Sequence, residues 1–340
     1  MAPPSPNTPT ANESLLEDTH HREVNYLRVS ITDRCNLACL YCGPRHGWEK
    51  LPPGEILRYE EILHLARIGA GIGLHKVRVT GGEPLVRRGV VDFIRRLHQV
   101  PGVREVCLTT NGVLLSEMAE PLFDTGLRHL NLSLDTLRRE RYFKLTGQDN
   151  FKEVWAGLER AAGLGFTPLK LNCVVMKDIN DDELLDFANL ARDYPFQVRF
   201  IELMPTVSRE LWDRHFLPMG EVHRRLKGLG LAREVPRSTA AGPARPFRVP
   251  GFKGELGFIS PISEHQCLTC NRLRLTAAGG LRACLFASTE LDLKGPLRQG
   301  LDDEALGRLF EQAILLKASG PRFDSPKTPL ACRPMVSIGG

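Results

Sequence analysis

The chain has 340 residues, of which 42% are hydrophobic, 25% charged and 7% aromatic, an ordinary composition for a globular protein. Its 45 basic and 40 acidic residues leave a net charge of +5, which is too small to indicate nucleic-acid binding over a broad basic face. No apolar run approaches the ~20 residues that a membrane helix needs, so we expect neither nucleic acid nor a membrane among the partners.

Residues 1–22 are rich in Pro, Ser, Thr and Asn and lack the cationic start and apolar centre of a secretory signal. We expect this segment to be disordered and the protein to be cytoplasmic. The chain has nine cysteines, an odd number in a sequence without a secretion signal, which argues against a disulfide framework. Because six of them are clustered, they indicate metal binding.

From residue 26 onward, short β-like runs alternate with amphipathic helical stretches. The runs are 26–32, 76–81, 105–112, 129–135, 168–177 and 197–205, and the helical stretches are 59–72, 89–99, 114–125, 151–165 and 181–193. Repeated β–α units predict a parallel sheet. Six of them predict a barrel or a partial barrel, which we assign to residues 23–215.

Aliphatic and polar residues alternate within these runs. Arg28 alternates with Leu27 and Val29, and Arg78 with Val77 and Val79; the same phase gives a polar side to the runs that contain Ser133 and Lys170. Strands of a helix-covered sheet are usually apolar on both faces. A polar face in at least four of them therefore indicates that this face meets water or a ligand.

The rhythm changes after about residue 205. A charged helical stretch at 219–230 and a Pro/Arg-rich link at 233–248 lead to further β-like runs, among them RLRLT and LRACLF, which are joined by the turn sequence AAGG. A helix near 302–318 and a Pro-rich tail follow. We expect a smaller C-terminal α+β domain over residues 216–340.

Cys35, Cys39 and Cys42 form a Cx3Cx2C group directly after the first β-like run. This is the end of the strand where α/β barrels carry their chemistry. A structural zinc site needs four ligands, and His46 is the only local candidate for the fourth. Three thiolates can instead hold three irons of a [4Fe–4S] cluster and leave the fourth iron open. Ligand counting favours the cluster and leaves zinc as the alternative.

Cys267, Cys270 and Cys284 form a second incomplete set, for which zinc with His265 is again an alternative. Arg272 and Arg274 follow directly at i and i+2 and therefore point to the same side of a strand. Two arginines beside a cluster offer planar donors to an anion or a nucleobase.

Thr80-Gly81-Gly82-Glu83-Pro84 ends the second β-like run, where the glycines allow close approach of a ligand and Glu83 can accept a bond from an ammonium group. Together, CNLACLYC at 35–42 and TGGEP resemble the radical S-adenosylmethionine (SAM) superfamily. The resemblance implies that SAM chelates the open iron through its amino and carboxylate groups. Tyr41 would lie by the adenine, and the Gly82-Glu83 segment would receive the methionine amino group.

From about residue 23 to residue 340 the pattern resembles the MoaA family, the GTP 3′,8-cyclases of molybdenum cofactor biosynthesis. The resemblance rests on EHQCLTCNRLRLT, KLNCVVMKDINDDELLDFA, VRFIELMP and the terminal Gly-Gly. It implies an incomplete (β/α)6 TIM-like barrel of the radical SAM type, closed by a C-terminal domain that carries a second [4Fe–4S] cluster, with GTP held between the two clusters.

The activity implied by the resemblance begins with a 5′-deoxyadenosyl radical that takes hydrogen from ribose C3′ of GTP. The C3′ radical then attacks C8, giving (8S)-3′,8-cyclo-7,8-dihydroguanosine 5′-triphosphate. The implied partners are an electron donor and the downstream cyclic pyranopterin monophosphate synthase (MoaC), and a homodimer is possible.

The resemblance also assigns roles to individual residues. The first cluster would be held by Cys35, Cys39 and Cys42, the second by Cys267, Cys270 and Cys284. The residues implied for SAM are Tyr41, Gly82, Glu83, Ser133 and Met204. Those implied for GTP are Arg28, Arg78, Thr109, Lys170, Arg272, Leu273 and Arg274. Arg28, Arg272, Arg274 and the tail residues Gly339 and Gly340 are the expected catalytic residues.

Two other readings stay open at this stage. A peptide-modifying radical SAM enzyme with an auxiliary cluster would keep both cysteine sets but has no need of Arg28, Arg78 and Lys170 on barrel strands. A non-enzymatic zinc-binding protein is the more distant alternative. Cys107, Cys173 and Cys332 match no cluster position, and we expect them to be free thiols.

Overall fold

The computed structural model describes residues 16–43, 49–231, 233–235, 242–264, 266–287, 289–320 and 335–339. Six parallel strands form its centre, and each lies inside the β-like run predicted for it. They are β1 (Tyr26–Ser30), β2 (Lys76–Thr80), β3 (Glu105–Thr110), β4 (His129–Ser133), β5 (Leu169–Val175) and β6 (Gln197–Glu202).

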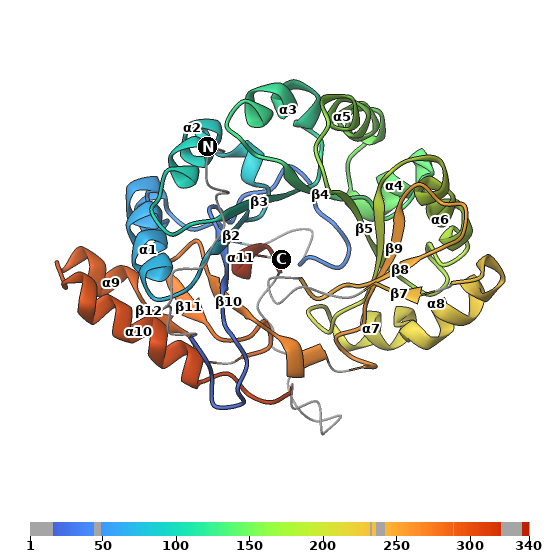
Figure 1. Ribbon diagram of the computed structural model, residues 1–340. Helices are drawn as coiled ribbons and strands as arrows, with labels where there is room; N and C mark the ends of the chain where they lie inside the picture. The colour runs from blue at the N-terminus through green and yellow to red at the C-terminus, as the bar shows by residue number, and fades with distance from the viewer. Residues whose placement is uncertain are drawn as a thin grey trace, which may run out of the picture.

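Helices cover the outside of these strands (Figure 1). The predicted ones are α1 (Tyr59–Gly71), α2 (Val90–His98), α3 (Leu115–Phe123), α5 (Phe151–Leu164) and α6 (Leu184–Asp193). Two more, α4 (Arg139–Thr146) and α7 (Arg209–His215), were not predicted because both are short and rich in charged residues. Among the described residues, no helix is both long and apolar enough to cross a membrane.

The C-terminal segment extends the same sheet at both ends. β9 (Glu255–Ile259) pairs in parallel with β6 and carries β8 (Arg245–Arg248) and β7 (Arg233–Glu234) beside it. β10 (Arg272–Leu275) pairs in parallel with β1 and carries β11 (Gly280–Arg282) and β12 (Leu291–Asp292). The strands of this predicted C-terminal domain pair with the backbone edges of β1 and β6 and so continue the barrel sheet.

The predicted alternation in the strands separates the core from the barrel interior. Leu27, Val77, Leu130 and Leu171 are each at most 1% exposed and belong to the main hydrophobic cluster, together with Phe93 of α2. The polar residues between them therefore face the inside of the barrel.

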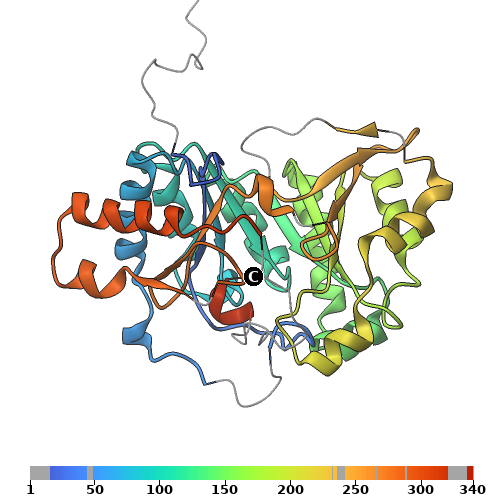
Figure 2. The same ribbon diagram turned by 90° about the horizontal axis from the view of Figure 1, so that it is seen from below.

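The remaining helices lie in the C-terminal half. α8 (Met219–Leu226) and α10 (Asp303–Leu315) confirm the helices predicted there, and α9 (Lys294–Arg298) precedes α10. The short helix α11 (Met335–Ile338) lies within the curve of the strands in Figure 1 and stays central, next to the C-terminus, in Figure 2.

Residues 16–22, which we expected to be disordered, are ordered. Glu17 forms a β-bridge with Glu23, and the Arg22 guanidinium pairs with the Asp18 carboxylate at 2.5 Å, with both side chains at most 5% exposed. Composition alone does not show that Arg22 also donates to the carbonyl oxygens of Cys267, Lys317 and Ala318, which lie far along the chain. Residues 1–15 lie outside the described part.

Candidate functional site

A cavity of about 290 Å³ lies inside the barrel. Both cysteine sets reach it, although they are separated by more than 200 positions in the sequence. Its lining includes Cys35, Cys39, Cys42, Cys267, Cys270 and Cys284. The two incomplete sets predicted from the sequence therefore face one common space.

The first cysteine loop follows β1 and is held by backbone bonds to α4. Ala38 N donates to Thr146 O at 2.8 Å, and Leu40 N donates to Leu145 O at 2.9 Å. The Asn111 amide lies 3.7 Å from the Cys35 sulfur. The unpredicted helix α4 thus fixes the backbone of the loop that carries the first set.

The second set is assembled by a hairpin. Cys267 and Cys270 are on or beside a 3-10 turn (Gln266–Thr269) that precedes β10, and Cys284 lies just past β11, which is antiparallel to β10. Burial alone would raise the pKa of the Cys270 thiol, but the charges of Arg272 and Lys317 lower it to about 6. These charges favour the thiolate, the form that binds metal, at Cys270, whereas burial and then the neighbouring cysteines raise the pKa of Cys267 to about 11.

The donor chemistry fits a cluster in both places. Each set supplies three thiols, each bears on the cavity, and no described cysteine completes either set. His46 and His265, the candidate fourth ligands for zinc, lie outside the described residues. Three thiolates beside an open cavity suit a [4Fe–4S] cluster whose fourth iron accepts an external ligand.

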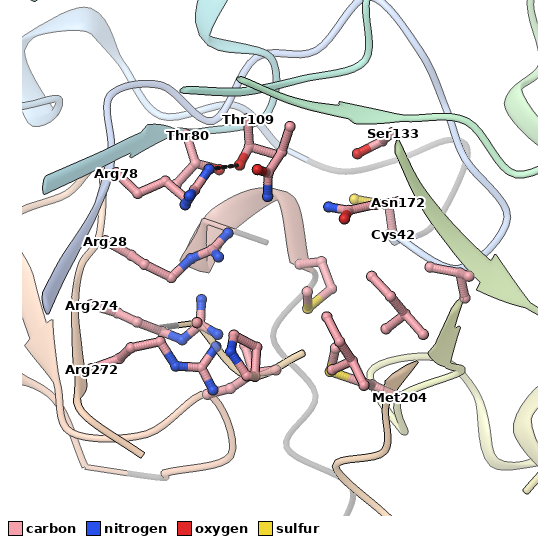
Figure 3. A pocket seen from close by; sticks show the side chains of 18 of the residues that line it. Arg28, Cys42, Arg78, Thr80, Thr109, Ser133, Asn172, Met204, Arg272 and Arg274 are labelled. Atoms are coloured by element: carbon pink, nitrogen blue, oxygen red, sulfur yellow. Dashed lines mark hydrogen bonds between the residues drawn. The ribbon is translucent and has the colours of Figure 1, made fainter. Parts of the chain in front are cut away.

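Four arginines form one wall of the cavity (Figure 3). Strand register places them side by side: Arg28 is opposite Arg274 on β10 and Arg78 on β2, and Tyr26 is opposite Arg272. A guanidinium N–H of Arg78 donates to the Thr109 hydroxyl at 3.3 Å. We call this wall, made of Arg28, Arg78, Arg272 and Arg274, the cation wall.

Two cations of the cavity, Lys170 and Arg199, have lowered pKa values, whereas the pKa of Arg78 is raised, against the effect of burial, by Cys107 and Tyr26. Burial, followed by repulsion from Arg199 and Arg78, lowers the pKa of Lys170 to about 7. Burial and then the charge of Arg78 lower the pKa of Arg199 to about 9. A cavity in which positive charge is costly binds a multiply charged anion favourably, since the anion removes the repulsion.

The opposite wall contains Ser133, Met204 and Cys42 (Figure 3). The Tyr41 hydroxyl donates to the Asp135 carboxylate at 2.6 Å, which fixes the ring beside the first cysteine set. Gly81 and Gly82 also line this region, and an added Cβ at Gly81 would lie 2.8 Å from the Thr32 carbonyl oxygen. The missing side chain at Gly81 therefore lets the Thr32 backbone pack against this turn, where Gly82 N donates to the Thr32 carbonyl at 2.6 Å.

Glu83 lines the cavity, but its carboxylate is already engaged. It accepts hydrogen bonds from Leu85 N at 3.0 Å, from the Thr110 hydroxyl at 2.7 Å and from Asn111 N at 2.7 Å. Burial raises its pKa to about 7, although these bonds oppose the shift. The side chain therefore ties β2 to β3, and an ammonium group would compete with these donors for its remaining acceptor capacity.

Most predicted site residues reach the cavity. Those that line it, besides the cysteines, are Arg28, Tyr41, Arg78, Gly82, Glu83, Thr109, Ser133, Lys170, Met204, Arg272 and Arg274. The Leu273 side chain is fully buried in the hydrophobic core, because it points to the opposite face of β10 from its two arginine neighbours; its predicted contact with GTP would therefore use its backbone.

The C-terminal tail enters the site. Arg274 donates to the Gly339 carbonyl at 2.8 Å, and Gly339 has a φ of 73°. An added Cβ there would lie 3.0 Å from Ser30 Cβ. Gly340 lies outside the described residues, as does Cys332. The predicted free thiols Cys107 and Cys173 are buried and unbridged.

Among the charged residues that line the cavity in the described part of the chain, the sequence reasoning gave no role to three: Arg199, Asp135 and Lys76. Arg199 and Lys76 have the same phase on β6 and β2 as the cations that were identified, so the alternation already contained that signal. Gly257 is opposite Arg199, and its missing side chain leaves room for the arginine, since an added Cβ would lie 3.0 Å from Arg199 Cγ. No local signal marks this pairing.

Two family models match the chain in succession. Residues 29–191 match the radical SAM superfamily, and residues 196–323 match the family described as Molybdenum Cofactor Synthesis C.

Several curated relatives match over nearly their whole length. A GTP 3′,8-cyclase of Moorella thermoacetica is 45% identical over 96% of this chain and 100% of its own. Enzymes of the same name from Alkaliphilus metalliredigens and Geobacter sulfurreducens are 44% and 41% identical, each over 96% of this chain and 100% and 99% of their own.

Among solved structures, Streptococcus suis SuiB bound to S-adenosylmethionine aligns with a TM-score of 0.60 at 14% identity. The alignment covers 92% of this chain and 77% of the SuiB chain. This similarity concerns the fold alone.

Proposed function

The chain belongs to the GTP 3′,8-cyclase family of radical SAM enzymes, and from this membership we propose that its cavity binds SAM against one wall and GTP against the other. The reaction is the cyclisation of GTP between C3′ and C8 in molybdenum cofactor biosynthesis. One observation supports the placing of SAM and GTP: the two incomplete cysteine sets line one cavity, and the cation wall forms one side of it.

Cys35, Cys39 and Cys42 would hold the first [4Fe–4S] cluster, which when bound supplies the electron that cleaves SAM to the 5′-deoxyadenosyl radical. Tyr41, held by Asp135, would orient the adenine, and Gly82, which lines the cavity, would lie by the methionine end of SAM. Ser133 and Met204 would line the remainder of this pocket.

Cys267, Cys270 and Cys284 would hold the second cluster, facing the guanine of GTP. Arg28, Arg78 and Lys170 would bind the triphosphate, because each forms a charge-assisted bond in a partly desolvated site. Lys76 and Arg199 add charge to the same cavity. Holding the nucleotide at both ends would fix ribose C3′ toward the SAM wall, which is the orientation that hydrogen abstraction requires.

Arg272 and Arg274 lie between the second cysteine set and the tail. Arg274 holds the Gly339 carbonyl, so the tail and the cation wall act as one unit in the proposal. The proposed partners are an external electron donor, MoaC as the enzyme that takes the product, and a second copy of the chain in a homodimer.

The direct test is an anaerobic incubation with SAM, a reductant and GTP, followed by detection of 5′-deoxyadenosine and a cyclised isomer of GTP. Two clusters predict about eight irons per chain. Zinc without iron in anaerobically purified protein would contradict the radical mechanism.

The variant Arg272→Ala with Arg274→Ala separates the two walls. We expect reductive SAM cleavage to continue while formation of the cyclised nucleotide is abolished, because only the cation wall is altered. Iron analysis accompanies this measurement, since Arg272 lies against Cys270. Normal cyclisation by the double variant would refute the assignment of these arginines.

A further inference from the structure

We propose that Lys317 is a positioning residue for the second cysteine set and raises the reduction potential of the cluster that this set holds. The inference rests on the proposed second cluster. It concerns a residue that neither the sequence pattern nor the mechanism above uses.

Lys317 lies two residues beyond α10 and is 4% exposed. Its ammonium group donates to the Arg272 carbonyl at 2.8 Å, to the Ala283 carbonyl at 3.2 Å and to the Cys270 sulfur at 3.6 Å. An ammonium has three donors, and these three contacts use all of them. The side chain is therefore fixed in direction.

The two carbonyls join the segments that carry the cysteines. Ala283 immediately precedes Cys284, and Arg272 begins the strand that follows Cys270. A single buried ammonium thus connects both arms of the β10–β11 hairpin at the level of the sulfurs. Without it, the two arms would keep their ladder bonds but lose the contact that sets the spacing of the ligands.

Arg22 extends this connection to the third cysteine. It donates to the Cys267 carbonyl at 2.6 Å and to the Ala318 carbonyl at 3.0 Å. Side-chain bonds therefore link the segment around Lys317 to Cys267, to Cys270 and to Ala283, the residue before Cys284. This explains why residues 16–22 are ordered: Arg22 brings them against the second set.

The positive charge of Lys317 should also affect the reduction potential of the second cluster, in addition to the spacing of its ligands. The contacts described for its ammonium group are two neutral carbonyls and one sulfur, so the Cys270 thiolate is the negative group that it meets directly. A buried cation beside a ligand sulfur withdraws electron density and favours the reduced cluster, and bonds to cluster sulfurs are a known control of potential. Removing the charge should make the second cluster harder to reduce.

The experiment compares Lys317→Met, which lacks charge and donors, with Lys317→Gln, which keeps an N–H donor but no charge. Iron content and an anaerobic redox titration followed by electron paramagnetic resonance are measured on the reconstituted full chain. We expect the second cluster to shift to lower potential in both variants. A tenfold change in its reduction equilibrium would appear as about 59 mV for a one-electron couple.

The first cluster serves as the internal reference, and its reduction potential should stay unchanged. Lys294→Met is the matched control, because the Lys294 ammonium bonds Glu55 and no cysteine. If Lys317→Met loses the second cluster and keeps the first, the positioning role is supported. The reduction potential of the second cluster in Lys317→Gln then tests the effect of the Lys317 charge.

Unchanged iron content and unchanged potential in both variants would overturn the inference. A wild-type chain with only about four irons would instead contradict the second cluster itself. Failure of the inference and failure of the proposed function are therefore distinguishable.

Discussion

At the scale of single residues, the cavity depends on ionisable groups whose charge is set by their neighbours. Lys170 is the clearest case, because its neighbours in the barrel interior include Arg78 and Arg199. Its pKa of about 7 is lowered by burial first and by these cations second. The free enzyme therefore holds Lys170 partly neutral near neutral pH, and a bound triphosphate would restore its positive charge.

Lys170 predicts a pH-dependent affinity for GTP. Above pH 7 the free side chain loses its proton, whereas the complex keeps it, so binding takes up a proton and the dissociation constant rises by up to about tenfold per pH unit. Calorimetry at pH 8 in buffers of different ionisation enthalpy measures this uptake. Lys170→Arg should bind GTP without that proton, and equal uptake by both proteins would contradict the prediction.

At the scale of elements, the barrel sheet carries the cation wall and the C-terminal tail packs against it. β10 inserts beside β1 in parallel, which aligns Arg274 with Arg28, and α11 brings Gly339 back to the same point. Gly339 has a positive φ and lies against Ser30 and Thr80. Both constraints favour glycine at this position.

Gly339→Ala tests whether this conformation of the tail matters. We expect cyclisation to fall by roughly tenfold or more, because a side chain at this φ costs about 1–3 kcal/mol and also meets Ser30. Iron content should be unchanged. Gly163→Ala in α5 is the control, since an added Cβ there meets nothing within 4 Å. A Gly339→Ala enzyme with normal turnover would show that the tail tolerates displacement.

At the scale of the whole molecule, segments near both ends of the chain are tied to the centre. The Asp18–Arg22 pair is nearly inaccessible to solvent, and Arg22 bridges the N-terminal segment, the second cysteine set and the residues after α10. A buried pair of this kind is costly to break from one side, because the remaining charge is left without its partner.

Arg22→Leu should destabilise the protein by about 3–5 kcal/mol. Adding Asp18→Asn should recover part of that loss, since the stranded carboxylate is removed. Thermal unfolding midpoints show whether the double variant is more stable than Arg22→Leu, as expected. Arg139→Leu, which breaks the exposed pair with Asp149, should cost only about 0–1 kcal/mol. A double variant less stable than Arg22→Leu would contradict this account.

Local spacing and strand phase were sufficient to predict the six parallel strands, the two cysteine sets and several cations of the interior. Within single strands the phase was applied incompletely, and contacts that join distant segments left no local signal. Leu273 was included with its arginine neighbours although its side chain belongs to the other face, and Arg199 was omitted although its phase was correct. Residues 16–22 and Lys317 gave no local signal, because their roles arise from carbonyls and a sulfur elsewhere in the chain.

The sequence by itself determined which chemistry is present: cysteine spacing specifies two sets of three thiols, and a period of two puts polar side chains on one face of each strand. Only the tertiary structure decided that the two sets share one cavity and that four arginines make one wall of it. The physical reason is strand pairing. The backbone edges of β1 and β6 are completed by β10 and β9, and this long-range register aligns Arg274 with Arg28 and leaves room at Gly257 for Arg199.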